Sequence, residues 1–232
     1  MNDAAGNELE LSFENCIRSS LGDTQFISQQ ANVTSWWKRI VDAYSESQRY
    51  YHTLSHIVSM HDTLEKVPSS LVVDKTAVVC AIAFHDIVYD PKAPHEQNEL
   101  DSLKLWLAFA QETELNQQLV VDVSNMIRST IHHKLPTDGY PPDLPLFLDL
   151  DLEVLGRNRE KYFEYAVGIR REYDNYPLED YCKGRTSVLE RLRSGDIFFT
   201  EHFKENSTET ARDNLSWEID LLGRGEVPVN IV

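Results

Sequence analysis

The sequence has few cysteines, few glycines and no long apolar run, and each shortage argues against a class of protein. The three cysteines, Cys16, Cys80 and Cys182, are widely spaced without a CxxC pair, which disfavours a disulfide framework or a structural zinc site and favours a reducing compartment. The glycines form no phosphate-binding cluster. The longest apolar stretch, residues 77–84, is far short of a membrane span, and the N-terminus lacks the basic and apolar regions of a secretory signal. We therefore expect a cytoplasmic protein.

Basic residues are also scarce, with 22 Lys and Arg against 38 Asp and Glu, so the formal net charge is −16. The mean field of such a chain repels nucleic acid duplexes and anionic membranes, and we expect neither as a partner. A small phosphorylated substrate remains compatible with this charge, because a bound metal and local cations reverse the potential inside one cleft. The sequence indicates no particular oligomeric state.

Strand-type alternation of apolar and polar residues is nearly absent, and apolar residues instead recur at helical spacing. Asp74 is placed to cap one helix, and Pro145 to begin another. The pattern predicts an all-α protein with a single helical-bundle domain over residues 35–222, a helical lead-in over 1–34 and a tail over 223–232. The main expected helices cover about residues 35–45, 49–67, 75–87, 95–111, 115–132, 159–174, 180–193 and 208–222.

Two histidines lie four residues apart, and a His-Asp pair follows later in the chain. His52 and His56 are expected on one face of a single helix. His85, next to Asp86, lies on an otherwise apolar stripe. Imidazoles and carboxylates are ligands for divalent metals, so these side chains are candidates for a metal site. The alternatives are that the first two are ordinary surface histidines and that His85 is a core histidine with a hydrogen-bond partner.

The segment LFLDLDLEVLG offers a further carboxylate. Asp149 and Asp151 are two residues apart, so they point about 200° away from each other on a helix. Asp151 has only apolar residues three and four positions away, whereas Asp149 has Glu153 among them. Because a lone carboxylate is costly to bury unless it is paired or metal-bound, we expect Asp151 to be a ligand. Asp149 would then support the site indirectly or interact with the helix dipole.

Five segments occur in an order that is typical of one known family. They are RYYHTLSHI (49–57), FHDIVYDP (84–91), NELDS (98–102), DLDLEVLG (149–156) and IRREY (169–173). This set resembles the HD superfamily of metal-dependent phosphohydrolases, and in particular a group of small HD proteins. The first segment is also similar to one in cyclic-nucleotide phosphodiesterases. Thr53 and Leu150 replace the group's usual Asn and Ala, and neither change removes a ligand.

The resemblance implies roles for individual residues. It implies four ligands for a divalent metal, namely His56, His85, Asp86 and Asp151. His52 falls where the phosphodiesterases keep a general acid for the leaving oxygen. His133 matches the spacing of a histidine that would bind a second metal. Mixed imidazole and carboxylate ligands suit Mn, Fe, Zn, Co or Ni better than Mg, and the sequence does not select among them.

The expected function is hydrolysis of a phosphate ester or anhydride of a small molecule, with a nucleotide as the favoured substrate. Asp86 would accept a proton from metal-activated water, and Glu99 would orient that water or His52. Three cations are candidates for holding the phosphate, with solvated surface positions as the alternative: Arg49, expected on the helical face of His52, Lys134 and Arg170. Two other functions stay open, an HD-fold di-iron oxygenase and a non-catalytic domain that binds a nucleotide.

Overall fold

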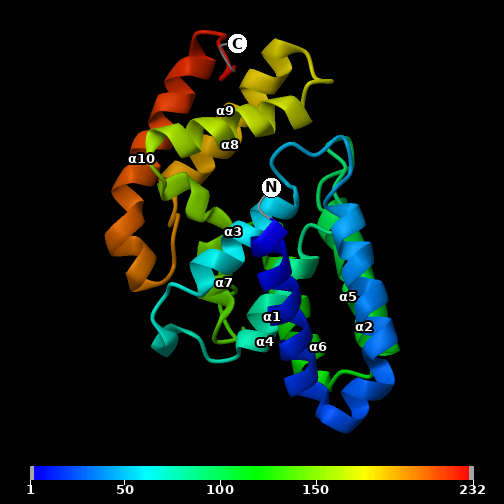
Figure 1. The fold of residues 1–232 in the computed structure, drawn as a ribbon. Coiled ribbons are helices and arrows are strands. Elements are labelled where there is room, and N and C mark those ends of the chain that lie inside the picture. Colours follow the sequence, from blue (N-terminus) through cyan, green and yellow to red (C-terminus); the bar gives the residue numbers. More distant parts are fainter. Residues whose placement is uncertain (1–2, 230–232) are drawn as a thin grey trace. The chain divides into compact units, whose positions relative to one another are not determined.

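The computed structural model describes the backbone of residues 3–229 and the side chains from residue 6 onward. Within this range the chain forms ten α-helices, two 3₁₀ helices and no strand, which confirms the predicted all-α class (Figure 1). The elements are α1 (Asp3–Leu21), α2 (Asp23–Ala43), α3 (Leu54–Leu64), η1 (Ser69–Leu71), α4 (Lys75–Phe84), α5 (Gln97–Glu112), α6 (Gln117–Ser129), α7 (Leu144–Leu152), η2 (Glu153–Gly156), α8 (Arg159–Glu172), α9 (Leu178–Ser194) and α10 (Glu201–Gly223). Among the described residues, no helix is both long and apolar enough to cross a membrane.

The chain divides into two compact units, and the last boundary between them falls inside α7. The first unit comprises the chain up to Ser47 and His52–Leu148, and the second comprises Gln48–Tyr51 and the chain from Asp149 onward. The segment Gln48–Tyr51 thus belongs to the second unit, although the next residue belongs to the first. The domain limits expected at residues 34 and 222 stay predictions, and the last three residues of the expected tail lie outside the described residues.

Helix α4 is the centre of the first unit and packs against α1, α3, α5 and α6. All of its residues from Ala77 to Phe84 are buried, because this is the apolar run noted in the sequence. The ring of Phe84 lies 5.1 Å from that of Phe109 and 5.3 Å from that of Trp106, measured between centroids. As predicted, Asp74 caps the helix, and its carboxylate accepts the backbone N–H of Ala77. The first unit thus holds the end of α4, which precedes His85, in a rigid aromatic core.

Helix α4 ends at Phe84, three residues earlier than expected. The N–H of Ile87 makes a long, 3.4 Å bond to the carbonyl of Phe84, and the N–H of Val88 donates to the Ser102 hydroxyl. The side chain of Ser102 therefore competes with the helix for the backbone of this segment. As a result, His85 occupies the C-cap position and Asp86 lies in the turn after the helix.

Helix α3 begins at Leu54, five residues later than predicted, so the expectation that His52 and His56 share a helix is wrong. The N–H of Leu54 donates to the carbonyl of Tyr44 at 3.3 Å and not to that of Tyr50, and Thr53 is extended, so residues 49–53 do not continue the helix. His56 is in the first turn of α3, whereas His52 and Arg49 precede the helix. The N–H groups of Tyr50 and Tyr51 in this non-helical segment donate to the carboxylate of Glu172, which is distant in the sequence.

The second unit is built around α10, which packs against η2, α8 and α9. Its core contains a buried ion pair in which Arg185 Nε donates to Glu218 Oε1 at 2.8 Å. The hydroxyl of Tyr162 donates to the same carboxylate, and the guanidinium also donates to the Tyr165 hydroxyl at 3.0 Å. These four side chains tie α8, α9 and α10 together and hold α8 in place.

Candidate metal centre

Three of the predicted ligands lie together in the first unit. His56 comes from the first turn of α3, His85 from the C-cap of α4, and Asp86 from the turn that follows. His56 and His85 are buried, at 5% and 1% exposure, and the side chain of Asp86 is 16% exposed. One nitrogen of each ring and one carboxylate oxygen all lie within 4.8 Å of one another. Among the described residues, these three form the one group of three or more metal-binding side chains whose donor atoms lie this close together.

The spacing of the donor atoms fits a single metal ion. Nε2 of His56 lies 3.3 Å from Nε2 of His85, and the latter lies 3.2 Å from Oδ2 of Asp86. Nitrogen and oxygen ligands about 2.1 Å from a tetrahedral metal are about 3.4 Å from each other. The two observed separations are close to that value, so the three side chains could hold a divalent cation with little movement.

The other ring nitrogen of His85, Nδ1, makes a hydrogen bond within its own helix. Its Nδ1–H donates to the backbone carbonyl of Ile82 at 3.1 Å, within the last turn of α4. A neutral imidazole that donates through Nδ1 presents an unprotonated Nε2, and that is the atom facing His56 and Asp86. The ring of Phe147 packs edge-on against His85 with centroids 5.8 Å apart. The helix end and this aromatic contact therefore fix both the tautomer and the orientation of the ring.

His52 lies beside this group and not within it. Its Nε2 is 3.8 Å from Oδ2 of Asp86, which is beyond hydrogen-bonding distance. The ring stacks on Tyr89 with centroids 4.2 Å apart, and its side chain is 19% exposed. A more exposed imidazole next to a metal site can exchange protons with solvent. This position is compatible with the acid role that the resemblance implies for His52.

The segment NELDS holds the chain that follows Asp86. The Asn98 side chain accepts the N–H of Asp90 and donates to its carbonyl, each at 3.0 Å. The fully buried Ser102 hydroxyl pairs in the same way with the N–H and carbonyl of Val88. The side chains of Asn98 and Ser102, both in α5, therefore hold the backbone of the segment after Asp86 by hydrogen bonds. The sequence singled out this segment only through the resemblance, and the structure gives it a positioning role.

The two aspartates of α7 differ from expectation in their burial. Asp149 is fully buried, whereas Asp151 is only half-buried. The leucines and phenylalanine of α7 are buried except for Leu152, which is half-buried, so the apolar neighbours along the helix did not identify the more buried aspartate. Asp149 accepts the N–H groups of Phe199 and Thr200 at 2.6 and 2.8 Å, and also the Thr200 hydroxyl at 2.6 Å. The Asp149 carboxylate is thus occupied by hydrogen bonds from Phe199 and Thr200, and burial raises its pKa to about 6.

Three predicted site residues of the first unit lie outside the group of His56, His85 and Asp86. Glu99 is half-buried in the first turn of α5. Lys134 is exposed in the loop after α6. His133 is half-buried in the same loop, with a positive φ of 47°. Their assigned roles stay predictions.

The remaining predicted residues, Arg49, Asp151 and Arg170, belong to the second unit. Arg49 is buried, at 4% exposure. Arg170 donates to the carbonyl of Tyr173 at 2.6 Å, and its guanidinium lies 4.6 Å from the centre of the Tyr181 ring. These contacts join Arg170 of α8 to the turn that follows and to α9. Phosphate binding by either arginine stays a prediction.

No protein-family model, no curated protein and no solved structure matches this chain. The resemblance to the HD superfamily therefore stays a prediction. The candidate metal centre is therefore assigned from the distances between its own side chains.

Sequence reasoning gave no role to two side chains that shape this site. Tyr89 stacks on His52, and the Tyr44 hydroxyl lies 3.2 Å from the backbone nitrogen of Asp86, whose N–H it accepts. In the sequence, Tyr89 is recognisable only as a neighbour of His85, four residues later. Nothing in the local pattern around Tyr44 indicates a contact with Asp86, 42 residues away. Both contacts depend on tertiary structure.

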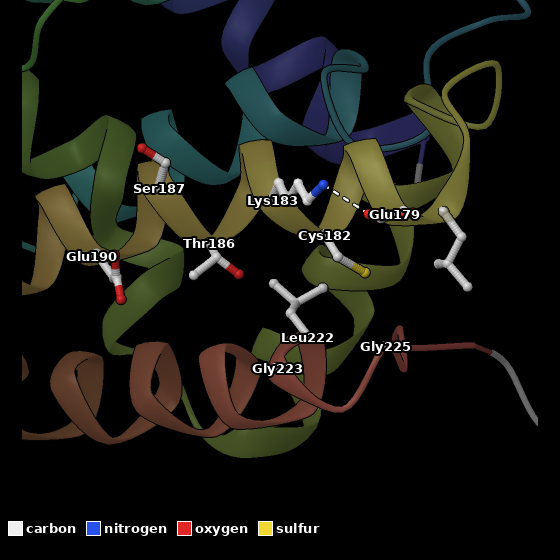
Figure 2. A pocket seen from close by; sticks show the side chains of 10 residues that line it. Glu179, Cys182, Lys183, Thr186, Ser187, Glu190, Leu222, Gly223 and Gly225 are labelled. Carbon is white, nitrogen blue, oxygen red and sulfur yellow. Dashed lines mark hydrogen bonds and ion pairs between the residues drawn. The ribbon is translucent and has the colours of Figure 1, made fainter.

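The second unit contains a cavity of about 680 Å³ (Figure 2). It lies between α9 and the end of α10, where Cys182 and Leu222 face each other and Lys183 pairs with Glu179 along α9. None of its described lining residues is a predicted site residue. Burial raises the pKa of the Cys182 thiol, which disfavours a reactive thiolate there.

Proposed function

We propose that this chain is a metal-dependent phosphohydrolase that hydrolyses a phosphate ester or anhydride of a small molecule, with a nucleotide as the favoured substrate. The observation that carries the proposal is the close group of His56, His85 and Asp86, whose donor atoms face one another at 3.2 to 3.3 Å. Such a group of buried imidazoles and one carboxylate is suited to a divalent transition metal such as Mn, Fe, Zn, Co or Ni.

A bound divalent ion would supply Lewis acidity, which lowers the pKa of a bound water and polarises a phosphoryl oxygen. His85 would present Nε2 as a ligand because its Nδ1–H is held by Ile82. Asp86, the most exposed of the three, has a second carboxylate oxygen that could accept the proton of the attacking water. His52 would donate a proton to the leaving oxygen from its position beside Asp86.

The resemblance extends this proposal to residues whose roles the geometry leaves open. It adds Asp151 as a fourth ligand and His133 as a ligand for a second metal, and we propose both roles on that ground alone. Glu99 would orient water or His52. The phosphate would be held by Arg49, Lys134 and Arg170.

A phosphate-release screen tests the proposed function. The protein would be stripped with a chelator and reloaded with Mn, Fe, Co, Ni, Zn or Mg. Each form would then be assayed on nucleotides and simple phosphate esters. We expect release with at least one metal and its loss in Asp86→Asn. The matched control is Asp90→Asn, an exposed aspartate four residues away, which should retain activity.

Other outcomes of this screen would favour the other two functions. Absence of phosphate release with every metal would contradict the proposal. Iron-dependent oxygen consumption in the same preparations would instead support a di-iron oxygenase. Tight nucleotide binding without turnover would support a non-catalytic domain.

A further inference from the structure

One residue of the first unit, Tyr44, is bonded to both segments that carry the candidate ligands. It is the C-cap of α2 and is buried, at 1% exposure. Its carbonyl accepts the N–H of Leu54, the first residue of α3, at 3.3 Å, and its hydroxyl accepts the N–H of Asp86 at 3.2 Å. All three residues belong to the first unit. The end of α2 is thus joined to the start of α3 and to the turn after α4.

The hydroxyl of Tyr44 acts at the point where α4 ends. In a continuous α-helix, the N–H of residue 86 would donate to the carbonyl of residue 82. Here the carbonyl of Ile82 accepts the Nδ1–H of His85 at 3.1 Å. The N–H of Asp86 donates to the phenol oxygen of Tyr44. The backbone of one candidate ligand is therefore held by Tyr44, beside a helical carbonyl that orients the imidazole of another.

The carbonyl of Tyr44 acts at the beginning of α3. The first N–H groups of an α-helix have no partner within the helix, and that of Leu54 donates to this carbonyl. His56 follows two residues later in the same turn, and its own N–H donates to the carbonyl of Thr53 at 2.9 Å. The bond between Leu54 and Tyr44 therefore holds the helical turn from which the imidazole of His56 projects.

Helix α2, which carries Tyr44, is itself anchored in the aromatic core of the first unit. Trp36, about two turns before Tyr44, is buried, and its ring lies 6.0 Å from that of Phe84, the last residue of α4. The same indole packs edge-on against Phe109 at 5.7 Å and donates its Nε1–H to the Glu112 carboxylate at 2.6 Å. The phenol of Tyr44 thus reaches Asp86 from a support that is fixed by other side chains.

We propose that Tyr44 is a positioning residue for the candidate metal centre, and that it sets the place of His56 relative to Asp86 before a cation binds. Its carbonyl holds the turn that carries His56, and its hydroxyl holds the backbone of Asp86. Ligands that are already oriented bind a metal more tightly, because less ordering is needed on binding. The inference rests on the proposed function, because it takes His56 and Asp86 to be metal ligands.

Tyr44→Phe tests the hydroxyl, because it leaves the ring and the carbonyl in place. Loss of a group that supports a metal ligand typically lowers metal affinity by about 10- to 100-fold, and we expect a loss of this size. Thr113→Val is the matched control. Thr113 is fully buried in the same unit, and its hydroxyl donates to the carbonyl of Phe109 at 2.7 Å, at the end of α5. This variant also loses a buried, hydrogen-bonded hydroxyl, and its metal affinity should not change.

A second pair of variants tests the carbonyl of Tyr44. Leu54→Pro removes the N–H that this carbonyl accepts, and proline is well tolerated at the first position of a helix. The preceding residue, Thr53, is already extended with a ψ of 176°, which is the conformation that a following proline favours. Leu54→Ala shortens the same half-buried side chain but keeps the N–H. We expect Leu54→Pro to weaken metal binding more than Leu54→Ala does.

Metal affinity and amide hydrogen exchange are the two readouts, and neither depends on phosphate release. Competition with a chromophoric chelator gives the affinity for each metal of the phosphate-release screen, under conditions in which circular dichroism shows every variant to be folded. Hydrogen exchange in the metal-free protein, followed by NMR, reports on the backbone N–H of Asp86. This exchange should be faster in Tyr44→Phe, because the acceptor of that N–H is lost, and unchanged in Thr113→Val.

Equal metal affinities of wild-type and Tyr44→Phe proteins would overturn the inference, and so would equal losses in Tyr44→Phe and Thr113→Val. A loss in Leu54→Pro no larger than that in Leu54→Ala would overturn the role of the carbonyl. A wild-type protein that binds a metal but hydrolyses no substrate would contradict the proposed function alone, and the comparison of affinities would still decide the role of Tyr44. A wild-type protein that binds none of the metals would overturn the metal centre and this inference together.

Discussion

His85 donates its Nδ1–H to the carbonyl oxygen of Ile82 at 3.1 Å, and this bond determines which nitrogen faces the candidate metal site. Ile82 is three residues earlier in α4, so the end of the helix itself selects the tautomer. The unprotonated Nε2 then faces Nε2 of His56 and Oδ2 of Asp86. An imidazole held in this way is already oriented before a cation binds. This favours binding, because little side-chain entropy is lost when the metal binds.

Removal of His56 should remove most of the metal affinity. Loss of a residue that only supports a ligand typically lowers affinity by 10- to 100-fold, and we expect His56→Ala to exceed about 100-fold because a donor atom is lost. Competition with a chromophoric chelator measures the change. His132→Ala is the control, since that imidazole is 57% exposed and lies outside the group of three. Equal affinity of wild-type and His56→Ala proteins would contradict the site.

Metal binding should stabilise the fold. A ligand that binds only the native state, at 100 times its Kd, adds about 2.7 kcal/mol to the free energy of unfolding. Thermal unfolding followed with and without a chelator should therefore show a higher Tm for the loaded protein. Asp86→Asn should reduce this shift strongly. A shift of the same size in that variant would place the bound metal elsewhere.

His61 should make the protein sensitive to acid. Its ring is buried at 4% exposure, and neither nitrogen makes a well-directed hydrogen bond, although Nε2 lies 3.2 Å from Glu65. Burial lowers the pKa of His61 below its usual value of 6.5, an effect that the Glu65 charge partly opposes. The unfolded chain then binds more protons than the native one just below pH 6.5, so the free energy of unfolding falls as the pH falls through this range.

Urea unfolding of the chelator-treated protein between pH 7.5 and 5 would measure this loss, with the pH range chosen to bracket the usual histidine pKa of about 6.5. The His61→Leu variant should lose less stability over the range than the wild type. His132→Leu, at an exposed histidine, should follow the wild type. A His61→Leu curve parallel to the wild type would show that this ring does not contribute.

The parts of the fold that could be predicted depend on local chemistry. The apolar run of α4, its Asp74 cap and Pro145 in the first turn of α7 each act within a few residues of the chain, and each appears where expected. The candidate ligands His56, His85 and Asp86 were likewise recognisable from their order in the sequence. The structure brings these three side chains together, and their role as ligands stays a prediction.

The predictions that failed depend on contacts distant in the sequence. The helix expected from residue 49 begins at Leu54, where the N–H of Leu54 donates to the carbonyl of Tyr44, ten residues earlier, and the N–H groups of Tyr50 and Tyr51 donate to Glu172, more than 120 residues later. The burial of Asp149 was missed because its partners, Phe199 and Thr200, lie about 50 residues away. Helical periodicity carries no signal for such pairs, since it describes only the faces of one element.

Breaking the buried pair of Arg185 and Glu218 should destabilise the second unit strongly. Glu218 is fully buried and the Arg185 side chain is 9% exposed, so removal of one partner leaves an uncompensated charge. We expect Glu218→Leu or Arg185→Met alone to cost about 3–5 kcal/mol, and the double variant Arg185→Met/Glu218→Leu to recover much of this loss. Urea unfolding gives the three values. Additive losses would show that the two charges are not coupled.

Asp149 and Asp151 should respond differently to the same substitution. Asp149→Asn replaces an acceptor oxygen that the backbone of Phe199 and Thr200 requires, so we expect a loss of about 1–3 kcal/mol in unfolding free energy with little change in metal affinity. Asp151→Asn should instead weaken metal binding and change stability little in the metal-free protein, because that side chain is half-buried and its proposed role is ligation. Chelator competition and urea unfolding on both variants separate the two effects. The reverse pattern would assign the ligand to Asp149, and unchanged metal affinity in both would remove this helix from the metal site.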